Sequence, residues 1–273
     1  TFLALMRLLQ APAATIEADK LELDGSDLLN ADAKALSDIR GSLVSMVFQD
    51  PMTSFDPLFT IGYQISETIQ THGNTGKKAA LAQARELLAK VEIKHPDRVL
   101  KQYPHQLSGG MLQRAMIAMA LSCEPRLLIA DEPTTALDVT VQAQILQLIT
   151  DLQQETGMSL IIITHDLGVI AETVDRVVVM YGGKVMEIGD TREIFEDPLN
   201  PYTKALIESI PGREAGKRKL IEIPGSSPNA LSPPSGCPFH PRCKLADDKC
   251  ASDAPNLSTF GKNRSAACWK VVQ

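Results

Sequence analysis

The stretch LLIADE, at residues 127–132, decides which fold class this sequence predicts. Its first four residues form an unbroken apolar run, which is typical of a strand that is covered on both faces of a sheet. A second run of this kind follows at residues 160–164. Between the two runs, residues 139–154 predict an amphipathic helix whose apolar face carries Ile145, Leu148, Ile149 and Leu152. Because strand, helix and strand alternate, we expect a parallel sheet in an α/β architecture.

The segments around this core predict further elements. Residues 42–48 predict a strand that ends at Gln49, and residues 61–71 and 77–91 have apolar residues at helical spacing. Residues 176–189 predict a β-hairpin with Gly182-Gly183 at its turn.

Two acidic residues follow the strand at 127–130 directly. Asp131 can supply a carboxylate for Mg²⁺, and Glu132 can supply a second one for a water molecule. Upstream, the sequence Ser108-Gly109-Gly110 precedes a predicted helix over 111–123, where unshielded N–H groups and the helix dipole favour an anion. An anion site, a metal site and a candidate base in this order predict a nucleotide hydrolase.

Composition limits the alternatives. A chain of 273 residues with 44% hydrophobic and 22% charged residues is expected to form one large domain, or one domain with an appendage. Its net charge of −6 argues against a nucleic-acid partner, which normally meets a basic surface. No apolar run approaches the roughly eighteen residues of a membrane span. Arg7 interrupts the opening apolar stretch, which we interpret as an amphipathic core helix rather than a secretion signal.

Five motifs occur in the order found in ABC ATPases. LSGGMLQR at 107–114 resembles the signature motif, and LLIADEP at 127–133 resembles the Walker B strand. Gln49 in MVFQDP resembles the Q-loop, Ala136-Leu137-Asp138 the D-loop, and His165 in IIITHD the switch histidine. The resemblance implies an ABC-type nucleotide-binding domain, with a parallel-sheet core and a helical subdomain at about residues 50–106.

The resemblance also implies a role for individual residues. In this family two ATPase subunits meet head to tail with ATP and Mg²⁺ between them. Asp131 and Gln49 would hold Mg²⁺, Glu132 would orient or deprotonate the attacking water, and His165 would contact the γ-phosphate. The residues expected to bind the nucleotide or to face the partner subunit are Ser108, Gly109, Gly110, Gln113 and Asp138. Glu132, His165 and Gln49 are the expected catalytic residues.

A phosphate-binding loop of the form GxxxxGKS or GxxxxGKT, which ABC ATPases place upstream of the Q-loop, does not occur in these 273 residues. The nearest imitation, GNTGKK at 73–78, follows no predicted strand and lacks a hydroxyl after its lysines, so we expect a loop before the helix at 77–91. Residues 1–9 resemble the helix that follows the phosphate loop. We therefore expect an N-terminally truncated sequence that is inactive by itself.

Further segments resemble the ATPase subunits of dipeptide, oligopeptide and nickel importers. These are QDPMTSFDP at 49–57, YPHQ at 103–106, NPYTKA at 200–205 and GCPFHPRC at 236–243. The resemblance implies two transmembrane permease subunits as partners at the cytoplasmic face of the membrane, a second identical or paralogous ATPase subunit, and an external binding protein. It favours dipeptides or oligopeptides as substrates, with nickel or another small solute as the alternative. Two alternatives come from other functional classes: a soluble ABC-type ATPase and a non-hydrolytic interaction module.

Four cysteines, Cys237, Cys243, Cys250 and Cys268, lie in a loop-rich tail. We place this tail in a C-terminal extension at 206–273, after an ATPase domain at 1–205. A reducing cytosol disfavours disulfides, and four thiolates suit zinc or an iron–sulfur cluster. The spacing lacks the CxxC pairs of structural zinc sites, and the family resemblance implies a 4Fe–4S cluster. Zinc and a conditional disulfide stay as alternatives.

Overall fold

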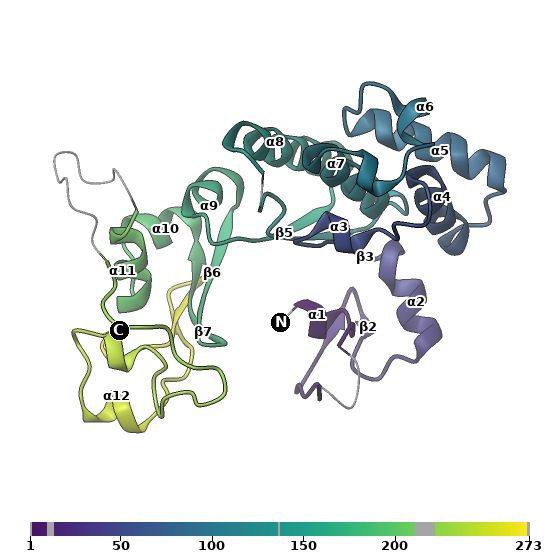
Figure 1. The fold of residues 1–273 in the computed structure, drawn as a ribbon. Helices are drawn as coiled ribbons and strands as arrows, with labels where there is room; N and C mark the ends of the chain where they lie inside the picture. Colours follow the sequence, from purple (N-terminus) through teal and green to yellow (C-terminus); the bar gives the residue numbers. More distant parts are fainter. Residues whose placement is uncertain (1, 10–13, 136, 211–221, 272–273) are drawn as a thin grey trace. The chain divides into compact units, whose positions relative to one another are not determined.

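The computed structural model describes residues 2–9, 14–135, 137–210 and 222–271 and separates into two compact units. The first unit spans Thr1–His165 and the second Asp166–Gln273, and each has its own sheet and core (Figure 1). Ala136 of the D-loop lies outside the described residues. Among the described helices, none is long and apolar enough to cross a membrane.

A parallel sheet of three strands forms the centre of the first unit, as the sequence predicts. Its order is β3 (Val44–Val47), β4 (Leu127–Asp131) and β5 (Ser159–Ile163), with Val44 opposite Leu127 and Leu127 opposite Ser159. Leu128 and Ala130 enter a core cluster on one face, whereas Ile129 enters a cluster on the other. The unbroken apolar run of β4 therefore has partners on both faces.

Helices cover both faces of this sheet (Figure 1). The larger cluster contains residues of α4 (Ile61–His72), α5 (Lys77–Lys90), α7 (Gly109–Leu121) and α8 (Val139–Thr156). The smaller cluster involves residues of α1 (Phe2–Leu5) and α2 (Ala33–Ser42). A short hairpin of β1 (Glu22–Leu23) and β2 (Ser26–Asp27) precedes α2.

The helices predicted at 61–71 and 77–91 both form, close to the expected bounds. Thr60 caps α4 through the N–H of Tyr63, at 3.3 Å. Ala80, Ala84 and Leu88 recur every four residues on α5 and are fully buried. The segment continues through α3 (Pro51–Ser54), α6 (Pro96–Val99) and a 3₁₀ turn at Pro104–Gln106.

The opening helix is shorter than expected. It ends at Leu5 because Arg7 has a positive φ of 50° and its guanidinium donates to the main-chain oxygens of Leu29 and Ala31, at 3.1 and 3.0 Å. The sequence GNTGKK leads directly into α5, with Gly76 at its N-cap, as predicted.

An antiparallel sheet of four strands organises the second unit. Its order is β6 (Arg176–Tyr181), β7 (Lys184–Asp190), β9 (Arg264–Ala266) and β8 (Ser258–Phe260). The predicted hairpin is β6–β7, with Gly182 and Gly183 at positive φ in its turn. The helical elements are α9 (Leu167–Thr173), α10 (Thr191–Glu196), α11 (Pro201–Glu208), a 3₁₀ turn (His240–Arg242) and α12 (Asp248–Ser252).

The tail expected to be loop-rich supplies two strands of this sheet, because β9 pairs with β7 through Glu187 opposite Ala266. The division into compact units falls at His165, and the expected domain boundary near residue 205 stays a prediction.

A buried ion pair fixes the loop before α11 to this sheet. Glu187 is fully buried and accepts hydrogen bonds from the N–H groups of Leu199 and Asn200, both at 2.9 Å. Its carboxylate also pairs with Nη2 of Arg264 at 3.2 Å. The side-chain amide of Asn200 donates to the main-chain oxygen of Ala267 at 2.9 Å. The loop, β7 and β9 are therefore held together by polar contacts that exclude water.

Candidate nucleotide site and cysteine pocket

Three residues from different predicted motifs meet at one edge of the parallel sheet. Gln49 follows β3, Glu132 follows β4 and His165 follows β5. Parallel strands end at the same edge, so their trailing residues come together. Nε2 of Gln49 donates to Oε2 of Glu132 at 2.6 Å, and Nδ1 of His165 lies 3.1 Å from Oε1 of the same carboxylate. The structure thus joins the Q-loop, Walker B and switch residues through hydrogen bonds.

The backbone at Glu132 aims its side chain at this edge. Glu132 has a positive φ of 44°, and its N–H donates to the main-chain oxygen of Ile163 at 2.8 Å. Thr135 closes a turn back to Glu132, and its Oγ1 donates to Oε2 of Glu132 at 2.8 Å. Sequence reasoning missed Thr135. The sequence feature that could have identified Thr135 is a hydroxyl side chain three residues after the candidate base, in a turn.

The two neighbouring carboxyl groups have opposite electrostatic environments. Hydrogen bonds from Thr135, and then from His165, hold the pKa of Glu132 below its usual value. Burial, reinforced by the nearby charge of Glu132, raises the pKa of Asp131. Glu132 is therefore ready as an ionised base, whereas Asp131 gains from a cation that offsets its desolvation. One carboxylate with phosphates and waters is a usual arrangement for Mg²⁺.

The glycine pair of the signature motif begins α7. Ser108 is the N-cap, and its Oγ accepts from the N–H of Met111 at 3.4 Å. Gly109 and Gly110 occupy the first turn, whose N–H groups have no intrahelical acceptors. A Cβ on Gly110 would lie 3.0 Å from Cγ1 of Val141 on α8. Glycine therefore allows α8 to pack close to α7, and it leaves the N–H groups of the first turn open to an anion.

Two residues expected at the nucleotide have contacts within this chain. Gln113 is only 2% exposed, and its Nε2 has no hydrogen-bond partner among the described residues. It lies one turn before Met116 and Ile117 on the buried face of α7, so the structure presents its amide to the core. Asp138 caps α8, where its Oδ1 accepts from the N–H of Val141 at 3.0 Å. Nucleotide contacts for both residues stay predictions.

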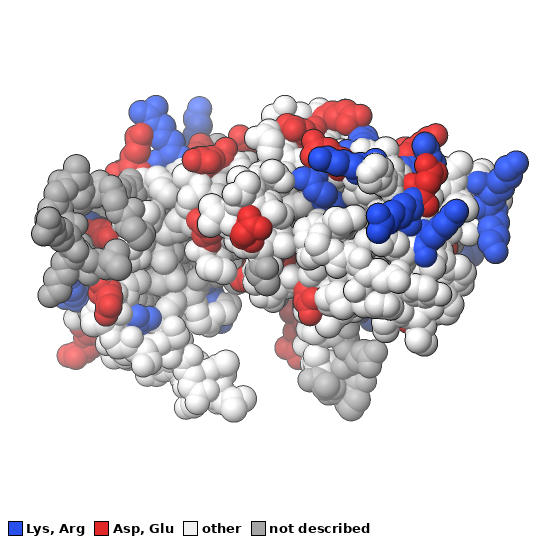
Figure 2. All heavy atoms as spheres, turned by 45° about the horizontal axis from the view of Figure 1, so that its top comes forward, with Lys and Arg blue, Asp and Glu red and all other residues white. Residues whose placement is uncertain are grey.

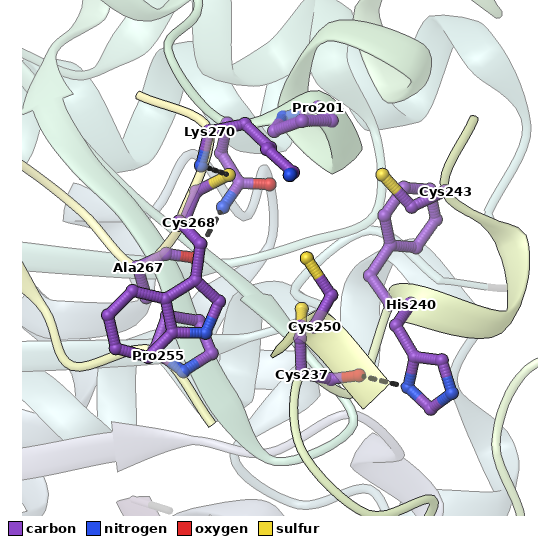
Figure 3. A pocket seen from close by; sticks show the side chains of 12 residues that line it. Pro201, Cys237, His240, Cys243, Cys250, Pro255, Ala267, Cys268 and Lys270 are labelled. Carbon is purple, nitrogen blue, oxygen red and sulfur yellow. Dashed lines mark hydrogen bonds between the residues drawn. The ribbon is translucent and has the colours of Figure 1, made fainter. Parts of the chain in front are cut away.

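The four tail cysteines line one pocket in the second unit (Figure 3). Cys250 on α12 is buried, and Cys237, Cys243 and Cys268 are partly exposed. All are free thiols. Burial raises the pKa of Cys237, Cys250 and Cys268, and neighbouring thiols raise that of Cys237 and Cys268 further. The pocket therefore brings together four free thiols, and a metal centre bound there would have to displace their protons.

The pocket offers the sulfur donors that both of the expected metal centres use. In the part of the chain that the structure describes, no three His, Cys, Asp or Glu side chains are grouped to hold a single ion. Zinc with four thiolates needs sulfur atoms about 3.8 Å apart. A cluster binds each thiolate through a different iron and so keeps the sulfurs further apart. The pocket supplies four thiols for either centre, and both the iron–sulfur cluster and zinc stay predictions.

Comparison with known proteins identifies the family. The family model "ABC transporter" matches residues 1–135, and "Oligopeptide/dipeptide transporter, C-terminal region" matches residues 186–250. The probable peptide ABC transporter ATP-binding protein y4tR of Sinorhizobium fredii is 48% identical over 271 residues, which are 99% of this chain and 81% of that protein. The dipeptide transport ATP-binding protein DppD of Escherichia coli is 46% identical over 266 residues, 97% of this chain and 81% of DppD.

Solved structures resemble the fold as well. The bacterial ABC transporter cassette MJ0796, solved as a dimer, has a TM-score of 0.57 at 30% identity and covers 63% of this chain and 73% of its own. The cassette cbiO1 of Clostridium perfringens has a TM-score of 0.60 at 26% identity, covering 72% and 73%. With these relatives, and with three ABC motifs joined at Glu132, the chain belongs to the ATP-binding proteins of ABC transporters, in the group with the oligopeptide/dipeptide C-terminal region.

Proposed function

We propose that this chain is the ATP-binding and hydrolysing subunit of an importer for dipeptides or oligopeptides. The observation that carries the proposal is the Glu132 carboxylate, which Gln49 and His165 contact from the ends of two other strands. Relatives at 46–48% identity are named for dipeptide or oligopeptide transport, which favours peptides over nickel.

Each residue at the sheet edge has a defined part in hydrolysis. Phosphoryl transfer needs mainly positioning and charge neutralisation. Glu132, ionised, orients the attacking water and accepts its proton once its present hydrogen bonds are exchanged. Asp131 provides the carboxylate for the Mg²⁺ of MgATP, and His165 is placed to contact the γ-phosphate. Gln49 donates to Glu132 directly, so a movement of the Q-loop changes the hydrogen bonding of the base.

The second ATPase subunit is proposed to supply the other half of each nucleotide site. Ser108 and Gly109 are exposed at the start of α7, where a phosphate on a facing subunit can reach their N–H groups. A related cassette forms a dimer.

The permease contact is proposed at exposed apolar side chains that follow the Q-loop. Met52 is 50% exposed and Leu58 78%, and the rings of Phe59 and Tyr63 stack at 4.7 Å. This surface lies close to Gln49 in the chain, so a permease segment bound there could influence Glu132. Figure 2 shows the basic side chains of the first unit standing among acidic ones on the face it presents, rather than in a continuous basic stripe. Peripheral attachment to the cytoplasmic face of the membrane follows from the permease contact.

The cysteine pocket is proposed to hold a 4Fe–4S cluster through Cys237, Cys243, Cys250 and Cys268. The four thiols that line one pocket support this proposal. Such a cluster supplies cross-linking of the tail and, in principle, one-electron chemistry. Iron and sulfide analysis of anaerobically purified protein tests the proposal, and protein that contains neither would refute it.

Glu132→Gln tests the hydrolytic role. In a protein that also contains a phosphate-binding loop, this variant should lose steady-state ATP turnover while an ATP-bound dimer accumulates, because the amide cannot accept the water proton. Glu86→Gln, an exposed position on α5, is the matched control and should hydrolyse ATP normally. Turnover measured in proteoliposomes with permease and peptide-loaded binding protein should rise with peptide. Undiminished turnover in Glu132→Gln would remove Glu132 from the mechanism.

A further inference from the structure

Two segments of the second unit meet beside the cysteine pocket. One segment is residues 247–253, which contains α12 and Cys250, and the other is residues 268–270, which begins with Cys268. Oδ1 of Asp247 accepts from the N–H of Cys250 at 3.0 Å, and the N–H of Lys270 donates to Sγ of Cys268 at 3.3 Å. Asp247 and Lys270 therefore each contact one of the pocket cysteines.

The side chains of these two residues then bind each other. Nζ of Lys270 forms an ion pair with Oδ2 of Asp247. This pair links the N-cap residue of α12, the helix that contains Cys250, to the residue that contacts Cys268. Figure 3 shows Lys270 beside Cys268 at the pocket. Both side chains are partly exposed, at 49% for Asp247 and 33% for Lys270, so the link can open without unfolding the sheet.

Further contacts join the same two segments. Nζ of Lys249 lies 3.8 Å from the ring centroid of Trp269, and Nε1 of Trp269 donates to the main-chain oxygen of Asp253 at 2.9 Å. On its other side, Ala267 donates to Met186 of β7 at 2.9 Å, which anchors Cys268 to the sheet. In the described part of the chain, the contacts of Lys270 and Trp269 with residues 247–253 hold residues 268–270 against α12.

We propose that Asp247 and Lys270 form a latch that holds Cys250 and Cys268 at the pocket and slows their reaction with thiol reagents and their loss of metal. Asp247 and Lys270 are positioning residues, since neither is a sulfur donor. The importance of the latch for a metal centre rests on the proposed cluster, whereas its effect on the thiols does not.

The first experiment measures thiol alkylation in the metal-free protein, with the rate at each cysteine followed by peptide mass spectrometry. Asp247→Asn keeps the helix cap, because asparagine caps as well as aspartate, but removes the charge. Lys270→Gln removes the opposite charge. Because exposed ion pairs contribute little, alkylation of Cys268 and Cys250 should quicken by about two- to fivefold in each variant. High salt should accelerate the wild type similarly and leave the variants unchanged.

The variants separate a latch from a direct effect of charge on the thiolates. Without a latch, loss of the Lys270 cation would disfavour thiolates and slow alkylation, whereas loss of the Asp247 anion would quicken it. Quickening in both variants supports the latch. Opposite changes, or no change in either variant, overturn it.

Matched controls are present in the same chain. Asp248→Asn and Lys262→Gln alter exposed charges of the same types and should react as the wild type does. Lys270→Arg keeps the cation and should restore the wild-type rate. Cys123, in the first unit, is an internal reference whose rate should not change.

The second experiment loads the protein anaerobically with ferrous iron and sulfide and follows iron release to a chelator. Release should be about two- to fivefold faster in Lys270→Gln and Asp247→Asn than in the wild type, for the same reason. Wild-type protein that takes up no iron or sulfide would refute the cluster proposal, and the alkylation rates would still decide on the latch. Uptake with equal release rates in all proteins would refute the latch for the loaded site.

Discussion

Replacement of Glu187 by alanine should strongly destabilise the second unit. Glu187 is fully buried and is the acceptor for three donors, the N–H groups of Leu199 and Asn200 and Nη2 of Arg264. The Arg264 side chain is only 11% exposed, so alanine removes its buried carboxylate and leaves this cation, among the described residues, only the longer contact with the exposed carboxylate of Asp197, at 3.5 Å, and the main-chain oxygen of Asp197. Breaking a buried pair from one side costs about 3–5 kcal/mol. Two main-chain N–H groups that lose their acceptor add about 1 kcal/mol or more each.

The single tryptophan makes the assay specific for this unit. Trp269 lies in the second unit, so its fluorescence during urea unfolding follows the sheet that contains Glu187. With a urea m-value of about 1.5 kcal/mol/M, a loss of at least 4 kcal/mol lowers the midpoint by more than about 2 M. Glu187→Gln should have a smaller effect, because an amide oxygen at Oε1 can still accept from Leu199 and Arg264.

Glu196→Ala is the control, since Glu196 is 61% exposed and forms an ion pair with Arg192 on the same helix. Its midpoint should shift by less than about 0.3 M, as expected for an exposed pair. A shift this small in Glu187→Ala as well would show that the buried pair does not stabilise the unit, and the reasoning would be wrong.

Two further changes test the cysteine pocket and the nucleotide site. Gly236→Ala should lower the urea midpoint followed by Trp269 fluorescence more than Gly183→Ala does. Both glycines have a positive φ. A Cβ at residue 236 would lie 2.5 Å from the main-chain oxygen of Cys250, whereas a Cβ at residue 183 would meet no atom within 4 Å. Equal shifts would contradict the proposed clash. Thr135→Val should raise the pKa of Glu132, measured by carbon-13 NMR of its carboxyl group, because the hydroxyl is the main cause of the lowered value. A carboxyl group whose pKa is lowered by folding stabilises the fold at pH values above its unfolded pKa, near 4.5, and this contribution is lost as the pH falls through the folded pKa. The variant should therefore lose this contribution. An unchanged titration of Glu132 would exclude Thr135 as the cause of the lowered pKa.

Local patterns in the sequence were sufficient for most of the elements around the site. The apolar run of β4, the periodicity of α5 and α8 and the glycine turn of β6–β7 depend on neighbours a few residues away, so they could be predicted with nearly correct bounds. The resemblance to ABC ATPases implied that Gln49, Glu132 and His165 act on one nucleotide, and the structure brings their side chains together.

The sequence alone therefore determined the α/β class and the family, and it named Gln49, Glu132 and His165 as members of the candidate nucleotide site. Tertiary structure decided the rest: Thr135 holds Glu132, Gln113 faces the core, and β9 joins the sheet of β7. It also brought four cysteines from separate segments to one pocket. These features depend on side-chain direction and on pairing between distant segments, which follow from the packing of the whole unit and not from any local repeat.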